Sequence, residues 1–138
     1  MKKVVVIDGQ GGKLGRLVIE QLKAISGNFK ICAVGTNSIA TATMLKAGAD
    51  YGATGENPVL VNCRDADVVI GPIGIVAVDS LHGEVTVAMV QAVGASAAHK
   101  VLLPIPGKCR ISVAGVANVP AAELVQLAVV RVLEIINA

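Results

Sequence analysis

Short apolar runs alternate along this chain with longer segments in which apolar residues recur every three or four positions. The short runs predict strands, because they are rich in Val and Ile and are bounded by glycine, polar or charged residues. They cover residues 3–7, 30–35, 67–71, 100–103 and 110–116. The pattern therefore predicts five strands.

The longer segments predict helices. In the first of them, Leu14, Leu17, Val18 and Leu22 share one face of a helix over residues 13–26. Further helices are predicted over residues 39–47, 56–65, 84–97 and 120–136, and residues 48–55 are predicted to form a loop.

This alternation of strands and helices predicts parallel pairing, because each helix returns the chain to the end of the sheet at which the preceding strand began. Right-handed crossovers then place helices on both faces. We expect a Rossmann-like three-layer α/β/α fold with a mostly parallel sheet of about five strands. A length of 138 residues without an internal repeat predicts a single domain over residues 1–138.

The composition narrows the classes of function. The chain is 54% hydrophobic and 16% charged, with a net charge of +2, so it has no basic stripe for nucleic acid or for anionic lipid. Phe29 and Tyr51 are its sole aromatic residues, which leaves no platform for base stacking. We expect a small-molecule partner, and neither nucleic acid nor a membrane.

Two further features favour a cytoplasmic location. The apolar run near the start covers only residues 4–7, too short for a signal-peptide core, and the longest uncharged apolar run, residues 68–78, is about half a membrane span. Cys32, Cys63 and Cys109 form no CxxC pair, as expected of free thiols in a reducing compartment.

A glycine-rich loop follows the first predicted strand. It is formed by Gly9, Gln10, Gly11, Gly12, Lys13, Leu14 and Gly15. The spacing is a variant of the dinucleotide fingerprint, and strand, turn and helix stand in the order that this fingerprint requires. Because glycine allows close backbone approach and a helix N-terminus presents unpaired N–H donors, we predict that the loop binds phosphate. The alternative is a tight turn that binds nothing.

Asp8 would repel a pyrophosphate unless it caps the loop's own amides, binds ribose hydroxyls or meets the phosphate through Mg²⁺; we favour capping. The acidic residue that binds the NAD ribose about 20 residues after the glycines is missing. Thr36, Asn37 and Ser38 stand there instead. These residues suit a 2′-phosphate and therefore favour NADP over NAD as the cofactor. Alternatively, they serve only as the N-cap of the next helix.

A second glycine turn begins at Gly71 and Pro72, after the third predicted strand. In a doubly wound sheet this turn would face the first loop across one crevice, where a ligand binds. A plain tight turn explains the same residues equally well.

The stretch DSLHGE holds the candidate catalytic residues, Asp79 and His82. Together they could supply a general base oriented by a carboxylate, although Asp79 is also an ordinary helix cap and Glu84 suits a first helical turn. Metal-ligand spacing is absent, so we expect no metal site. Cys109 lies between Lys108 and Arg110, whose charges favour a thiolate, or it is an incidental loop thiol.

The last predicted helix carries Leu127 and Val130 within its otherwise polar face. Monomers rarely expose apolar side chains together. We therefore expect a homo-oligomer, with a homodimer formed through this helix or through the helix that begins at Glu84.

Three separated stretches, VVVIDGQGG, GTNSIATATMLKAGADYGATGEN and DSLHGEVT, resemble a small bacterial family of uncharacterised Rossmann-like proteins, a domain of unknown function. The resemblance covers essentially the whole chain, although the family tends to have a further glycine in place of Lys13. It implies the fold and a bacterial cytoplasmic origin, and it transfers no catalytic residue.

Two hypotheses of function follow. In the first, the chain is a small nucleotide- or dinucleotide-binding protein, with an NAD(P)-linked role if it is an enzyme. In the second, it is a non-enzymatic structural or sensing homo-oligomer whose glycine loop is only a turn or holds phosphate or a small metabolite. The sequence does not decide whether the chain is an enzyme.

Overall fold

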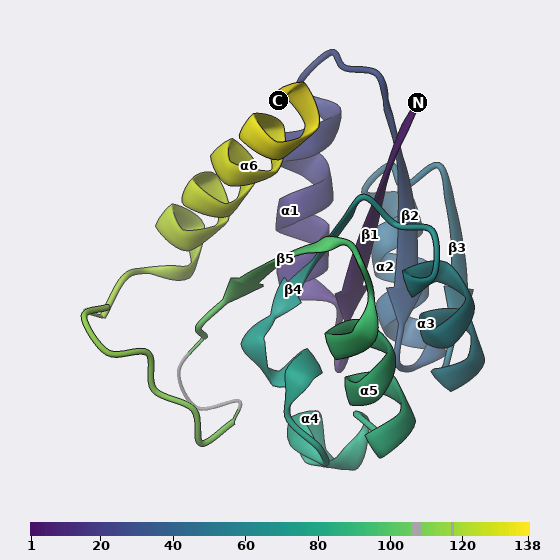
Figure 1. The fold of residues 1–138 in the computed structure, drawn as a ribbon, viewed down its shortest axis with the longest axis vertical. Helices are drawn as coiled ribbons and strands as arrows, with labels where there is room; N and C mark the ends of the chain where they lie inside the picture. Colours follow the sequence, from purple (N-terminus) through teal and green to yellow (C-terminus); the bar gives the residue numbers. More distant parts are fainter. Residues whose placement is uncertain (106–108, 117) are drawn as a thin grey trace.

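The structure is a computed structural model that describes residues 1–105, 109–116 and 118–138. Its strands and helices alternate along most of the chain, as Figure 1 shows. The strands are β1 (Lys2–Asp8), β2 (Phe29–Gly35), β3 (Tyr51–Thr54), β4 (Val68–Pro72) and β5 (His99–Leu103). The helices are α1 (Lys13–Lys23), α2 (Ser38–Lys46), α3 (Glu56–Cys63), the 3₁₀ turn η1 (Ile73–Val76), α4 (Ser80–Gly83), α5 (Val87–Ala95) and α6 (Ala121–Asn137).

All five strands form one parallel sheet in the order β3-β2-β1-β4-β5. The chain therefore moves outward from β1 in one direction, returns to its other side at β4, and continues outward in the opposite direction. This reversal separates the loops that follow β1 and β4 and opens the crevice in which ligands of doubly wound proteins bind. The predicted Rossmann-like α/β fold is confirmed.

The sheet is buried on both faces. Val4 and Val6 of β1 belong to a core with α1, α2 and α6, whereas Val5 and Ile7 point into a second core with α3 and α5. All four side chains are at most 2% exposed. A fully buried Val or Ile contributes roughly 1.5–3 kcal/mol, so this uninterrupted apolar strand is the centre of both layers.

One predicted strand is wrong. Residues 110–116 are exposed and form no strand. The strand that was not predicted is β3, which lies in residues 48–55, a segment expected to be a loop. The apolar pattern misleads because a strand needs a hydrogen-bonding neighbour, and the outer edge of β5 has no pairing with residues 110–116. β3 lacks an apolar signal because it is a short edge strand with Tyr51, Gly52 and Thr54 largely or partly open to solvent.

The helix predicted over residues 84–97 begins later than expected. Asp79, Leu81 and His82 have positive φ angles of 65°, 56° and 56°, so the chain makes a left-handed turn at α4. The helix proper, α5, starts after Thr86, whose Oγ1 accepts a hydrogen bond from the Met89 amide at 3.2 Å. The true cap is therefore Thr86 rather than Asp79.

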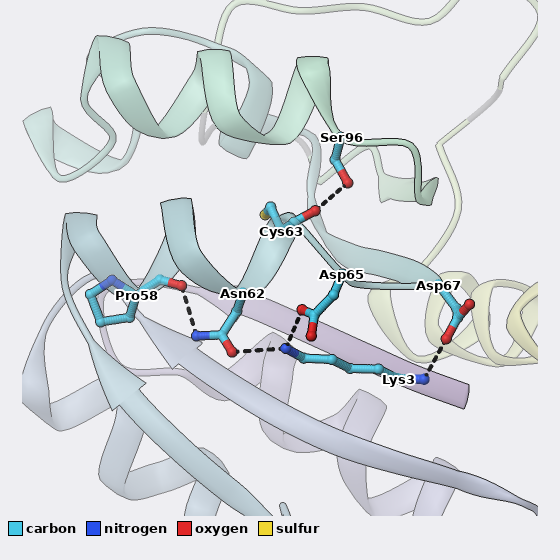
Figure 2. Close-up of polar contacts among 7 residues, drawn as sticks. All are labelled: Lys3, Pro58, Asn62, Cys63, Asp65, Asp67 and Ser96. Atoms are coloured by element: carbon cyan, nitrogen blue, oxygen red, sulfur yellow. Dashed lines mark hydrogen bonds and ion pairs between the residues drawn. The ribbon is translucent and has the colours of Figure 1, made fainter. Parts of the chain in front are cut away.

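Polar contacts fasten the sheet at its amino-terminal edge, shown in Figure 2. The Nζ atom of Lys3 donates to Asn62 Oδ1 at 3.0 Å and to Asp65 Oδ1 at 2.7 Å, and the Lys3 amide donates to Asp67 Oδ2 at 2.8 Å. Ser96 Oγ donates to the carbonyl oxygen of Cys63 at 2.6 Å, which joins the ends of α5 and α3. This edge is closed by the protein's own groups, whereas the glycine loop lies at the opposite, carboxyl edge.

Within the described residues, no helix is both long enough and apolar enough to span a bilayer.

Candidate functional site

The glycine loop makes a tight connection between β1 and α1. Gln10 and Gly12 have φ angles of 50° and 74°, in the left-handed region. The Gly12 amide donates to the carbonyl oxygen of Gly9 at 2.9 Å, and the Arg16 amide donates to that of Gly12 at 2.9 Å. The chain thus turns into the helix within a few residues of the end of the strand.

The side chain of Asp8 binds backbone amides of this loop. It is only 5% exposed, its Oδ1 accepts from the Gly9 amide at 2.8 Å, and its Oδ2 accepts from the Gly15 amide at 2.7 Å. The expected capping role is confirmed. Because both carboxylate oxygens accept from the loop's own amides, the negative charge is compensated inside the loop.

The glycines of the loop differ in their surroundings. A Cβ atom at Gly12 would lie 2.9 Å from the backbone of Ala40, and one at Gly15 would overlap the side chain of Met44. At Gly9, a Cβ would lie 2.8 Å from Glu84 Oε1. These three positions need glycine for packing. A Cβ at Gly11 would meet no atom within 4 Å, so Gly11 faces open space.

Three backbone amides at this junction remain available. The N–H groups of Gly11, Lys13 and Leu14 have no acceptor among the described residues. These residues line a cavity of about 500 Å³. The same cavity is lined by Asp8, Gly9, Gln10, Gly12, Leu17, Pro72, Leu81, Ile105 and Ala121. The structure therefore joins Pro72 of the second turn to the first loop, as expected of a doubly wound sheet.

Five of the predicted cofactor-binding residues do not line that cavity: Thr36, Asn37, Ser38, and the two glycines Gly15 and Gly71. Gly15 is buried and is not part of its lining. Gly71 is also buried, and a Cβ there would overlap the carbonyl oxygen of Ile7. Both glycines allow close packing of neighbouring elements.

Glu84 engages the residues predicted for the ribose. Its Oε1 accepts from Asn37 Nδ2 at 2.8 Å and from Thr36 Oγ1. The same oxygen accepts from the Gln10 amide at 3.0 Å. Burial alone would raise the pKa of Glu84, but the hydrogen bonds from Thr36, Gln10 and Asn37 together hold it below its usual range. An ionised carboxylate thus joins the glycine loop to the start of α2.

The N-cap interpretation of this segment is confirmed at Asn37, whose Oδ1 accepts from the Ala40 amide at 2.9 Å. Ser38 is the first residue of α2 and is exposed. Sequence reasoning missed the clamp formed by Glu84, because Glu84 lies 74 residues beyond Gln10 and no local spacing connects them.

Asp79 and His82 line a second cavity of about 730 Å³, together with Gln10, Cys109 and Arg110. Both are exposed on the left-handed turn, and their catalytic assignment stays a prediction. Lys108, the other cation expected beside Cys109, lies outside the described residues. Within the described part of the chain, no group of three or more His, Cys, Asp or Glu residues could hold a metal ion.

The two remaining cysteines belong to the interior. Cys32 and Cys63 are 1% and 2% exposed, in the core beside α3 and α5. Burial raises the pKa of both thiols, which keeps them protonated at neutral pH. They are structural side chains rather than nucleophiles.

The parallel sheet, its order reversal at β1 and β4, and the glycine turn after β1 define a Rossmann-like α/β protein. The chain belongs to the family described as "Domain of unknown function (DUF3842)", whose model matches residues 3–137. The family expected from the three sequence stretches is confirmed.

One solved structure with a similar fold is a dodecameric FMN-dependent Ubix-like decarboxylase from Escherichia coli O157:H7. The two chains are 17% identical, with a TM-score of 0.47, over 100% of this chain and 96% of that one. A comparison with curated proteins gave no match.

Proposed function

We propose that the chain binds a nucleotide, or another small phosphate-bearing ligand, at the glycine loop. The observation that carries this proposal is the set of amides of Gly11, Lys13 and Leu14, which have no acceptor among the described residues and which belong to the lining of a cavity. A loop that served only as a turn would not require a hollow beside its free donors.

The electrostatics of the loop favour an anion. The amides lie at the N-terminus of α1, where the helix dipole places a partial positive charge, and Lys13 adds a full charge. Hydrogen bonds from such amides to an ionised acceptor are each worth about 1.5–3 kcal/mol. Asp8 also lines the cavity, and the hydrogen bonds that it accepts from the Gly9 and Gly15 amides offset part of its negative charge.

The remainder of the cavity suits a less polar group. Leu14, Leu17, Leu81, Ile105 and Pro72 line it beyond the loop. Apolar walls with a few convergent polar donors are typical of sites for small organic ligands. We infer that the phosphate binds above Gly11 and that the ring of the ligand lies against these side chains.

The more specific expectation of NADP finds no support in this geometry. Thr36 and Asn37, which were expected to bind the 2′-phosphate, already donate to the carboxylate of Glu84. An ionised carboxylate in that position would repel a phosphate. We therefore propose phosphate recognition by the loop without assigning a nicotinamide cofactor or a reaction.

Calorimetry and thermal denaturation with inorganic phosphate, AMP, ATP, FMN, NAD and NADP test the proposal. A ligand at 100 times its Kd should add about 2.7 kcal/mol to the free energy of unfolding. In Gly11→Val, a side chain would enter the open space above the loop, and we expect loss of ligand binding with unchanged folding.

Gly94→Ala is the matched control, because Gly94 is an exposed glycine of α5 with no atom near its missing Cβ. We expect it to bind like the wild type and to be slightly more stable, by roughly 0.5–1 kcal/mol. Gly12→Val is unsuitable, since its positive φ and its contact with Ala40 would damage the fold. The proposal fails if no probe binds, or if binding survives in Gly11→Val.

A second candidate function, self-association, is favoured by α6. Leu127 and Val130 are 57% and 54% exposed on this helix, one turn apart. We propose that this pair contributes to a contact with a second copy of the chain.

A further inference from the structure

We propose that Glu84 is a specificity-determining residue that fills the position where a dinucleotide would place its adenosine ribose. The inference rests on the proposed function, because it restricts the phosphate-bearing ligand to one without a second nucleotide half. It differs from the sequence expectation, in which Thr36, Asn37 and Ser38 were available to a cofactor.

The donors around Glu84 come from separate parts of the chain. The Gln10 amide belongs to the loop after β1, whereas Thr36 Oγ1 and Asn37 Nδ2 belong to the loop after β2. All of them converge on the single atom Oε1 of Glu84, which itself follows β4. Asn37 Nδ2 also donates to the Gln10 carbonyl oxygen at 2.9 Å, so the two loops are held together around the carboxylate.

This position corresponds to a defined part of a dinucleotide site. In Rossmann-like proteins the pyrophosphate lies over the glycine turn, and the adenosine ribose lies between that turn and the end of the second strand. The Gln10 amide and the side chains of Thr36 and Asn37 are the donors that a ribose oxygen would find there. In this chain Glu84 Oε1 has already taken them.

The missing side chain of Gly9 makes room for this arrangement. A Cβ at Gly9 would lie 2.8 Å from Glu84 Oε1 and 2.9 Å from Leu81 Cδ1. The space next to the glycine turn is thus occupied by Glu84 and Leu81 rather than open to a ligand. Glu84 does not line the cavity beside the free amides, which is bounded by Leu81 and extends toward Pro72, Ile105 and Ala121.

The position of Glu84 is fixed by backbone hydrogen bonds of the turn that precedes α5. The Asp79 amide donates to the carbonyl oxygen of Val85 at 2.8 Å, and the Val85 amide donates to that of Ser80 at 3.2 Å. Leu81 and Val85 are 4% and 1% exposed. A dinucleotide would have to displace a carboxylate whose backbone is anchored on both sides.

Adenosine 2′-monophosphate and NADP are the probes that test this inference, because both carry a phosphate for the donors that Glu84 now holds. Glu84→Ala removes the carboxylate oxygen that the Gln10 amide, Thr36 and Asn37 share as an acceptor. We expect the Kd of both probes to fall at least tenfold relative to the wild type, with a smaller gain for NAD. Circular dichroism would verify that the variant is folded.

Two further variants keep the test decisive. Glu84→Gln removes the charge and keeps the length of the side chain, so it should gain affinity in the same order but by less, and it decides the question if Glu84→Ala does not fold. Glu56→Ala removes another carboxylate that accepts from a threonine, Thr86, at 2.7 Å and away from the glycine loop. This control should show no gain.

The inference is overturned if the folded Glu84 variants bind adenosine 2′-monophosphate and NADP no better than the wild type, or if the wild type binds NADP as tightly as its best mononucleotide. Failure of the proposed function would look different. In that case inorganic phosphate and mononucleotides would not bind the wild type, while adenosine 2′-monophosphate would still gain affinity in Glu84→Ala.

Discussion

Asp8 and Glu84 are carboxylates that hold the same loop from two directions. Asp8 binds the amides at the two ends of the loop, Gly9 and Gly15, and Glu84 binds the amide of Gln10 between them. The Gly12 amide donates to the Gly9 carbonyl oxygen, and the amides of Gly11, Lys13 and Leu14 are the donors of the proposed site. Each N–H of this turn is thus assigned either to the fold or to the proposed site.

Replacing Asp8 by Ala should destabilise the protein strongly. The amides of Gly9 and Gly15 would be buried without this acceptor, and each such loss costs roughly 1–3 kcal/mol, so we expect the free energy of unfolding to fall by about 2–5 kcal/mol. Urea denaturation measures the change. Glu20→Ala, which removes an exposed partner of Arg16, should stay within about 0.5 kcal/mol. Equal effects of the two substitutions would contradict the role of Asp8.

The two carboxylates also show what sequence reasoning reaches at the scale of single residues. Asp8 could be predicted as the cap of the loop, because it accepts from residues one and seven positions away. Glu84 could not, because its partners lie 47 to 74 positions away and are brought together only by the sheet. Its local pattern suited a helix N-terminus equally well.

At the scale of elements, the edge strand β3 depends on one side chain. Asp50, just before β3, accepts from the Ile31 amide through Oδ2 at 2.8 Å, and its own amide donates to the Ile31 carbonyl oxygen at 2.9 Å. Lys23 Nζ lies 3.4 Å from Asp50 Oδ1. Asp50 therefore takes the place of a further pair of residues in the ladder between β2 and β3.

Acid should weaken this attachment. The hydrogen bond from the Ile31 amide, helped by the charge of Lys23, holds the pKa of Asp50 below its usual range. A carboxyl whose pKa is lowered by folding stabilises the protein above its unfolded pKa of about 3.9, and this contribution is lost as the pH falls through the folded value. We expect Asp50→Asn to be less stable than the wild type at pH 7.

The stability difference between Asp50→Asn and the wild type should shrink as the pH falls from about 4 toward 2. Urea denaturation at several pH values between 2 and 7 would measure it. A difference that stayed constant over this range would show that the charge of Asp50 is unimportant.

The strand predictions were wrong where the apolar sequence pattern and the presence of a neighbouring strand disagree. β3 is short, exposed and contains Gly52, so its sequence carries no apolar period, yet parallel pairing to β2 and the contacts of Asp50 define it. Residues 110–116 carry apolar residues in alternation, but they pair with none of the strands that the structure describes. Hydrogen-bonding neighbours are a property of the folded chain, which a linear pattern does not contain.

At the scale of the whole molecule, the parallel order could be predicted because buried strands and intervening helices permit few other topologies. α1 and α6 pack side by side on one face of the sheet, as Figure 1 shows. Both helices begin next to the cavity, at Lys13 and Ala121. The outer face of α6 is left with Leu127 and Val130 exposed.

Charges placed on that face should prevent the proposed self-association. We expect the wild type to elute at a multiple of its 14.0 kDa mass in light scattering after size exclusion, and the double variant Leu127→Glu with Val130→Glu to elute as a monomer. Gln126→Glu adds charge at an exposed polar position of the same helix and should leave the mass unchanged. A monomeric wild type would exclude this interface.

The left-handed turn at α4 is connected to the glycine loop through Glu84. Asp79, Leu81 and His82 adopt a backbone that costs about 1–2 kcal/mol for each residue other than glycine, and the turn persists because its surroundings oppose relaxation. Glu84 leaves this turn and ends on the glycine loop. The conformation at the mouth of the crevice therefore depends on the backbone of this turn as well as on the hydrogen bonds within the glycine loop.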